Sequence, residues 1–401
     1  MVKIDRNLVG GSIVLLFTVN VFNLLNFLFQ IFMTRFLSIV DYGTLVVILY
    51  IIIIFAVFNE SIQTIIAKYV SKEKNDSKIK NILNKSMRKS FKLAFVIFLI
   101  YLLFAIPLSF LLKIDYYLLA LAGPMIFSAF LMPVTRGLLL GKKFFLPLGM
   151  SLVVEGLSKL FLSLILIFVG FKVVGAIFGI ILSNVIAFFY TFIKLKKIRA
   201  KKEKIAKTLD IYKYSKPVFV TNLIIILFLS LDIIIAKVLF SPETTGIYAI
   251  ASVISKSIFM ISHPLGKALF PLSASNIKVK KSSNLFLNSL LMFFLIIIPI
   301  LCVILIFPEI VVRIFTGRII KEIIPVIFIL GLSVSLLSLS NLIISYKLSQ
   351  NKTKNYLGFV LIIPIQLFLT IYFSSDILSF CYALLCASAI FLITSVALLN
   401  K

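Results

Sequence analysis

Several residue types and motifs are scarce in this chain of 401 residues, and some of these scarcities argue against particular kinds of site. There are 14 acidic residues against 41 Lys and Arg, no tryptophan, one histidine and three cysteines. The cysteines, Cys302, Cys381 and Cys386, all fall inside apolar runs and therefore suggest neither a disulfide framework nor a metal cluster, so we expect no metal site. The phosphate-cradling motif GxxxxGK[ST] is also missing, and we therefore expect no nucleotide cofactor.

Long apolar runs dominate what is present. The chain is 61% hydrophobic and 14% charged, and the apolar residues form blocks separated by short lysine-rich stretches. Runs such as TLVVILYIIIIFAVF (44–58) and NSLLMFFLIIIPILCVILIF (288–307) approach or reach the ~20 residues that a helix needs to cross the hydrocarbon layer. Because lipid offers no partner for backbone polar groups, such runs are expected to be helical. The sequence predicts a polytopic membrane protein.

The apolar blocks divide into twelve predicted spans. We expect the first to be a retained helix and not a removed signal peptide, because no small-residue cleavage site follows it. The spans are 11–33, 44–66, 91–112, 116–138, 148–170, 172–193, 217–239, 246–268, 284–307, 322–345, 356–374 and 377–399.

The distribution of basic residues predicts the topology. If the amino terminus is cytoplasmic, most of the 41 Lys and Arg residues fall in connections on the cytoplasmic side, as the positive-inside rule requires. We therefore expect a multi-pass protein of the cytoplasmic membrane with both termini in the cytoplasm. The basic charge is confined to connections, where membrane insertion and anionic lipids explain it, so we expect no nucleic-acid partner.

The largest cytoplasmic connection, KLKKIRAKKEKIAKTLDIYKYSK (194–216), separates six spans from six. It predicts an N-terminal lobe at 1–193 and a C-terminal lobe at 217–401. Gly43 and Gly246 each open a helix after an outward-facing polar turn, so the lobes read as parallel repeats. The predicted fold class is all-α, with about twelve transmembrane helices in two six-helix pseudo-repeat lobes around a central cavity.

Four stretches carry a family resemblance: TRFLSIVDYG (34–43), TRGLLLGKKF (135–144), LDIIIAKVLFSPETTGIYAIAS (231–252) and VRIFTGRIIKEIIPVIFIL (312–330). In their order and spacing the chain resembles polysaccharide-type flippases of the multidrug, oligosaccharidyl-lipid and polysaccharide exporter superfamily. The resemblance implies a transporter that moves lipid-linked oligosaccharide or polysaccharide precursors across the membrane by alternating access. It also implies a lipid-linked sugar substrate, contact with membrane lipids and glycan-assembly enzymes as candidate partners. We expect a monomer.

A polar stripe runs along the first predicted span. At 100° per residue its four amides fall within about 120° of arc, so they share one helix face. Such a face either lines a cavity or hydrogen-bonds to neighbouring helices. As many as four amides on one face favours the cavity, and we predict substrate contact for Asn20, Asn23, Asn26 and Gln30.

Three acids lie inside predicted spans and away from their ends: Glu60, Glu155 and Asp232. Glu155 and Lys159 are four residues apart and can pair within their own helix, which would neutralise both without any further role. Because no nucleotide site is present, the cycle must draw on an ion gradient or the membrane potential. A carboxylate inside a membrane is the usual carrier of H⁺ or Na⁺. The three acids are therefore the ion-coupling candidates, with Asp232 first because it has no basic residue four positions further along its helix.

Lys256 lies near the middle of the eighth span with no acid within four residues of it. It must either pair with Asp232 or Glu60 from a neighbouring span or face an aqueous cavity. The resemblance favours the cavity, because it implies cations that bind an anionic phosphate or pyrophosphate linkage. On the same ground Arg35 and Lys159 are further candidates for substrate contact.

Two other functions remain open from the sequence. One is a multidrug or cation antiporter of the same superfamily. The other is a membrane glycosyltransferase or polysaccharide polymerase, which needs acids and often a metal at an outer face. The predicted outer acids are each on a separate short turn and never form a DxD motif. We therefore expect a transporter and not an enzyme.

Overall fold

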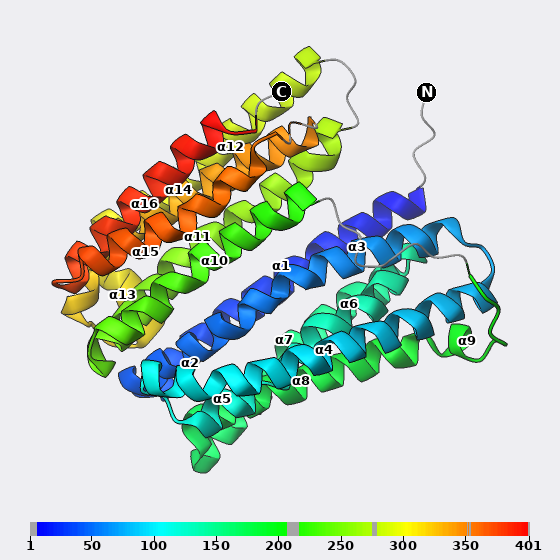
Figure 1. Cartoon of the computed structure of the whole chain (residues 1–401), viewed down its shortest axis with the longest axis horizontal. Helices are drawn as coiled ribbons and strands as arrows, with labels where there is room; N and C mark the ends of the chain where they lie inside the picture. Colours follow the sequence, from blue (N-terminus) through cyan, green and yellow to red (C-terminus); the bar gives the residue numbers. More distant parts are fainter. Residues whose placement is uncertain (1–5, 207–215, 275–278, 351, 353, 400–401) are drawn as a thin grey trace. The chain divides into compact units, whose positions relative to one another are not determined.

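The computed structural model describes residues 6–206, 216–274, 279–350, 352 and 354–399 (Figure 1). Within these ranges every regular element is an α-, 3-10 or π-helix. Helices satisfy their backbone polar groups internally, as a lipid environment requires. The prediction of an all-helical, multi-pass membrane protein is confirmed.

The observed helices account for the predicted spans. Among the described residues, ten helices are long and apolar enough to cross a membrane. One of them, Phe145–Lys194, contains two predicted spans, since the backbone at Gly170 has φ 103° and interrupts the helix there. The shorter apolar segment Tyr356–Tyr372 coincides with the eleventh predicted span.

The first compact unit, called unit one below, comprises Met1–Phe36 and Phe55–Tyr214. Helix α7 packs against α1 and α8, and α6 packs against α3, α4 and α8; Figure 1 shows α6, α7 and α8 as neighbouring ribbons. The helices of this unit are α1 (Arg6–Phe36), α3 (Val57–Lys72), α4 (Asp76–Leu112), α5 (Tyr116–Ala122), α6 (Met125–Gly141), α7 (Phe145–Leu166), the π-helix η2 (Ile167–Phe171), α8 (Lys172–Lys194) and α9 (Lys196–Arg199).

The second compact unit, called unit two below, comprises Leu37–Ile54 and Ser215–Lys401. Helix α14 packs against α11 and α16, and α15 packs against α10 and α16; these helices run together in the green to red part of Figure 1. The elements are α2 (Ile39–Ile53), α10 (Lys216–Leu239), α11 (Pro242–Ala274), α12 (Val279–Ile306), α13 (Pro308–Thr316), η3 (Lys321–Ile323), α14 (Ile324–Ser349), η4 (Tyr356–Leu361), α15 (Ile362–Tyr372) and α16 (Ile377–Ala397).

Helix α2 packs on α10 and α11 of the second unit, which the predicted lobe at 1–193 did not anticipate. The predicted span 44–66 is divided by a 3-10 turn at Ile54–Ala56 between α2 and α3. A close approach of two glycines joins α2 to α11. A Cβ atom added to Gly43 would lie 2.8 Å from the Cα of Gly246. The two glycines that follow similar turns in the sequence are therefore in contact.

The start of the basic linker is bound to α4. The backbone N–H of Lys204 donates to the carbonyl of Ser77 over 3.1 Å. The side-chain amides of Asn81 and Asn84 donate to the two carboxylate oxygens of Glu203 over 2.7 and 2.9 Å. These hydrogen bonds lower the pKa of Glu203. The linker is thus attached to the first unit as far as Ala206, whose N–H donates to Asn81.

Candidate functional site

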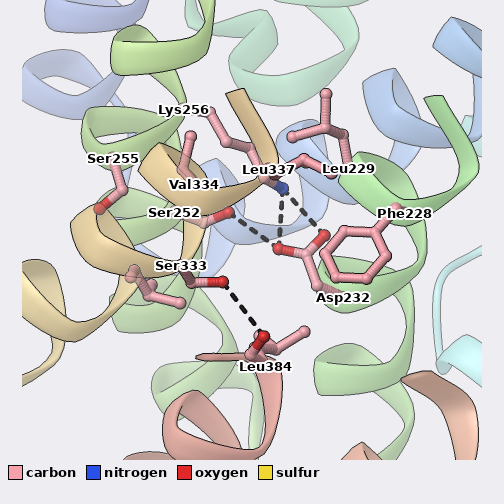
Figure 2. Close-up of a pocket in the computed structure, with 11 residues that line it drawn as sticks. Phe228, Leu229, Asp232, Ser252, Ser255, Lys256, Ser333, Val334, Leu337 and Leu384 are labelled. Carbon is pink, nitrogen blue, oxygen red and sulfur yellow. Dashed lines mark hydrogen bonds and ion pairs between the residues drawn. The ribbon is translucent and has the colours of Figure 1, made fainter. Parts of the chain in front are cut away.

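A buried ion pair joins α10 and α11 in the second unit. The Nζ atom of Lys256 lies 2.9 Å from Oδ1 and 2.8 Å from Oδ2 of Asp232. Lys256 is 6% exposed and Asp232 is 4% exposed. Figure 2 shows the ammonium directed at the carboxylate. Of the two environments that the sequence allowed for Lys256, the structure has the ion pair.

Further groups surround this pair. The Tyr248 hydroxyl donates to Oδ2 of Asp232 over 2.8 Å, and the Ser252 hydroxyl does so over 3.3 Å. The ammonium of Lys256 lies 4.1 Å from the centre of the Tyr50 ring, which α2 supplies. A cation over an aromatic face is attracted by the ring quadrupole. The carboxylate is therefore held by three donors, and the ammonium lies between a carboxylate and an aromatic ring.

A small cavity lies beside the pair. Its volume is about 20 Å³, which is enough for one water molecule and too little for a sugar or a lipid headgroup. In the conformation described, this cavity does not give Lys256 access to a substrate. The walls, drawn in Figure 2, include Phe228, Ser252, Ser333, Leu337 and Leu384.

Unit one holds a second cluster of charged residues. The Nη2 atom of Arg136 on α6 lies 2.6 Å from Oε2 of Glu155 on α7. The same guanidinium also donates to the hydroxyl and the carbonyl oxygen of Ser151 over 3.1 and 3.2 Å. Arg136 is 6% exposed. The spacing allowed Glu155 to pair with Lys159, but in the structure its carboxylate pairs with Arg136.

Lys159 has a different environment. Its ammonium donates to Oδ1 of Asn26 on α1. It lies 4.8 Å from the centre of the Phe29 ring and 6.0 Å from that of Phe22. No carboxylate among the described residues forms an ion pair with it. Lys159 is thus a half-buried cation held by one amide and two aromatic rings.

The amide stripe of α1 is partly engaged within its own helix. The amide of Asn20 donates to the carbonyl of Leu16 over 2.8 Å, and that of Asn26 donates to the carbonyl of Phe22 over 3.0 Å. Asn20 is exposed, whereas Asn23, Asn26 and Gln30 are half-buried. The structure thus brings one member of the stripe, Asn26, to a predicted cation, Lys159.

Two predicted site residues remain to be placed. Arg35 is exposed at the end of α1. Glu60 belongs to α3, but its side chain lies outside the described part of the structure. In the residues that were described, no group of three or more His, Cys, Asp and Glu side chains could hold a metal ion.

The sequence analysis missed four important side chains: Tyr248, Ser252, Arg136 and Tyr50. Tyr248, Ser252 and Lys256 are spaced four residues apart, so this helical period could have predicted that both hydroxyl groups would meet the same partner as the lysine. Arg136 and Tyr50 had no such signal, because their partners come from distant helices. Only the tertiary fold connects them.

Comparison with known proteins gives the family. Residues 9–277 match the family model described as polysaccharide biosynthesis protein. The chain belongs to this family. A search of curated proteins gives no match.

Comparison with solved structures identifies the fold of this chain. A multidrug resistance MATE transporter of the MOP superfamily, facing inward, has a TM-score of 0.76 at 14% identity, over 94% of both chains. The lipid II flippase MurJ in an inward closed conformation has a TM-score of 0.72 at 13% sequence identity. The match covers 97% of this chain and 87% of the MurJ chain. A MOP superfamily transporter from Pyrococcus furiosus has a TM-score of 0.54 at 15% sequence identity. The match covers 98% of this chain and 95% of that transporter. The chain is thus a multi-pass membrane protein of a polysaccharide biosynthesis family, and its fold is that of the MATE and MurJ structures.

Proposed function

We propose that this chain is a flippase that moves lipid-linked oligosaccharide or polysaccharide precursors across the cytoplasmic membrane by alternating access. The family match supports the link to polysaccharides, and the fold resembles that of a lipid II flippase among others. The substrate of this proposal carries an anionic phosphate or diphosphate between its lipid and its sugar. The transporter therefore needs a cation that is available to it.

The state of the charged residues inside the helices carries the proposal. Of the three ion-coupling candidates, the two whose side chains the structure describes are each paired with a cation. Asp232 pairs with Lys256, and Glu155 pairs with Arg136. Lys159 has an amide and two aromatic rings for partners. This pattern suits an anionic substrate better than a cationic drug, which would need an accessible carboxylate. It favours the flippase over the multidrug antiporter, although a MATE transporter shares the fold.

Each predicted residue has a role in this proposal. Lys159 and, after separation from Asp232, Lys256 bind phosphate oxygens as compact charges, while Arg35 can form a bidentate contact. The amides at Asn20, Asn23, Asn26 and Gln30 hydrogen-bond sugar hydroxyls. Membrane lipids surround the protein, and glycan-assembly enzymes supply and receive the substrate. The protein works as a monomer with both termini in the cytoplasm.

Asp232 links the cycle to an ion gradient in this proposal. When Lys256 leaves Asp232 for a phosphate group, the freed carboxylate can accept H⁺ or Na⁺, so ion and substrate binding assist each other. Glu60 and Glu155 are the other candidates. Normal transport by Asp232→Asn, with the gradient dependence unchanged, would contradict the assignment to Asp232.

A transport assay in proteoliposomes tests the function. The protein is reconstituted, and movement of a lipid-linked oligosaccharide is compared with uptake of a cationic dye under the same imposed gradient. The flippase proposal predicts movement of the lipid and none of the dye. Dye transport without lipid movement would establish the antiporter instead.

A further inference from the structure

We propose that Lys159 is the anion-binding group of unit one, and that Glu155 is an internal competitor which Arg136 keeps away from it. The inference deepens the proposed function and rests on it for the identity of the lipid. It predicts that variants of Arg136 and Glu155 change anion affinity in opposite directions. The three side chains lie on α6 and α7 of one compact unit.

The first step of the argument concerns the needs of the Lys159 ammonium. An ammonium group has three donors. In the described structure one of them bonds to Asn26, and two aromatic rings lie nearby. Rings attract a cation without satisfying its hydrogen-bonding capacity. Donor capacity that is still unused suits the oxygens of a phosphate group.

The second step concerns the nearby carboxylate. Glu155 precedes Lys159 by four residues on α7, so the two side chains lie on the same face and can reach each other. In the structure Glu155 instead bonds to Arg136 over 2.6 Å. A guanidinium that also binds two oxygens of Ser151 is fixed in place and holds the carboxylate firmly. Arg136 therefore leaves Lys159 available.

The third step is the consequence for a transport cycle. An unpaired charge is costly in a membrane interior. Movement of Glu155 to Lys159 would leave the buried guanidinium of Arg136 without its carboxylate, so Glu155 stays on Arg136 and Lys159 stays open to an anion. Arg136 and Glu155 thus act as positioning residues, which set the affinity without touching the ligand.

Binding of farnesyl diphosphate to the purified full chain in detergent provides the test. Lys159→Gln should weaken binding about 10- to 100-fold, because a charge-assisted contact is lost. Arg136→Gln frees Glu155 to pair with Lys159 and should weaken binding by about 10-fold. Glu155→Gln removes the competitor, so affinity should stay the same or rise by about 3-fold. The double variant Arg136→Gln/Glu155→Gln should recover at least the wild-type affinity.

Recovery in the double variant is the result that a structural role would not give. If Arg136 only stabilises the fold, its loss weakens binding with or without Glu155, and the inference is overturned. Unaltered binding in Lys159→Gln also overturns it. Melting temperatures are recorded for each variant. Arg136→Lys keeps a cation beside Glu155 without the fork of donors, so it should lose less affinity than Arg136→Gln. Lys142→Gln, which breaks the 2.8 Å ion pair with Asp76 in the same unit, is the control and should not alter binding.

Different ligands identify the source of the phosphate and separate this inference from the flippase proposal. Farnesol lacks the anion and should not bind, and binding of farnesol equal to that of the diphosphate contradicts the anion site. Inorganic pyrophosphate that binds as well as farnesyl diphosphate supports the site while showing that the lipid adds nothing. Lys159-dependent binding without lipid-linked sugar transport rejects the flippase alone. Transport that survives Lys159→Gln rejects the inference alone.

Discussion

Replacing Lys256 with glutamine tests how much the buried ion pair stabilises unit two. The ammonium lies within 2.9 Å of both carboxylate oxygens of Asp232, and both side chains are buried. Removing one partner of a buried pair costs about 3 to 5 kcal/mol, because the remaining charge stays desolvated. Since 1 kcal/mol shifts the melting temperature of a domain of this size by about 2 to 4 °C, Lys256→Gln should lower it by roughly 6 °C or more.

The second variant of the cycle removes the carboxylate as well. Lys256→Gln/Asp232→Asn leaves no buried charge at the pair, and Tyr248 and Ser252 can still donate to the amide oxygen. Most of the lost stability should therefore return. Lys256→Arg keeps the charge but is larger than the buried site allows, so it should lose less stability than Lys256→Gln without matching the wild type. Thermal unfolding is followed by fluorescence in one detergent for all variants.

The half-buried pair of Lys142 and Asp76 provides the control for this cycle. Its side chains are 24% and 36% exposed, so breaking it should cost only about 0 to 1 kcal/mol. An unchanged melting temperature in Lys256→Gln would refute the reasoning. So would a double variant that melts no higher than the single one.

Three further predictions concern topology, packing and pH. Single cysteines in a Cys-free variant should be labelled from outside the cell at Glu243 and not at Lys204; external labelling at 204 would reverse the topology. Gly246→Ala places a Cβ atom 2.3 Å from the carbonyl oxygen of Ile39, so it should destabilise unit two by about 1 to 3 kcal/mol in thermal unfolding, and an unchanged melting temperature would contradict the close packing. The lowered pKa of Glu203 means that its contact with α4 stabilises the linker above the ordinary value of 4.5 and is lost as the pH falls through the lowered pKa. A spin label at Lys204 should therefore remain ordered at pH 5 and gain mobility only in stronger acid, whereas mobility already high at pH 5 would contradict the contact.

Much of the architecture could be predicted from local sequence. The apolar blocks give the spans directly, because length and composition alone decide whether a helix can cross lipid. The assignment of α2 to the second unit could not be predicted in this way. It follows from the packing of α2 on α10 and α11, where Gly43 meets Gly246, and the sequence shows two similar turns without showing that they touch.

The charged residues show where local reasoning fails. Spacing of four residues correctly places Glu155 and Lys159 on one face, but a guanidinium from another helix offers the carboxylate a stronger partner. For Lys256 the sequence required a partner or a cavity and could not choose between them. The choice depends on how α10 packs beside α11, which no pattern within one helix records.

Movement of a fluorescent lipid-linked sugar between leaflets tests the central claim most directly. A polyprenyl diphosphate sugar with a reducible fluorophore is placed in proteoliposomes, and an impermeant reductant then reports the fraction left in the inner leaflet. The account predicts that the wild-type protein brings this lipid to the reductant, that Lys159→Gln is much slower, and that a matched polyprenyl glycoside without phosphate stays protected. Equal movement of the phosphate-free lipid, or no movement of either lipid, would contradict it.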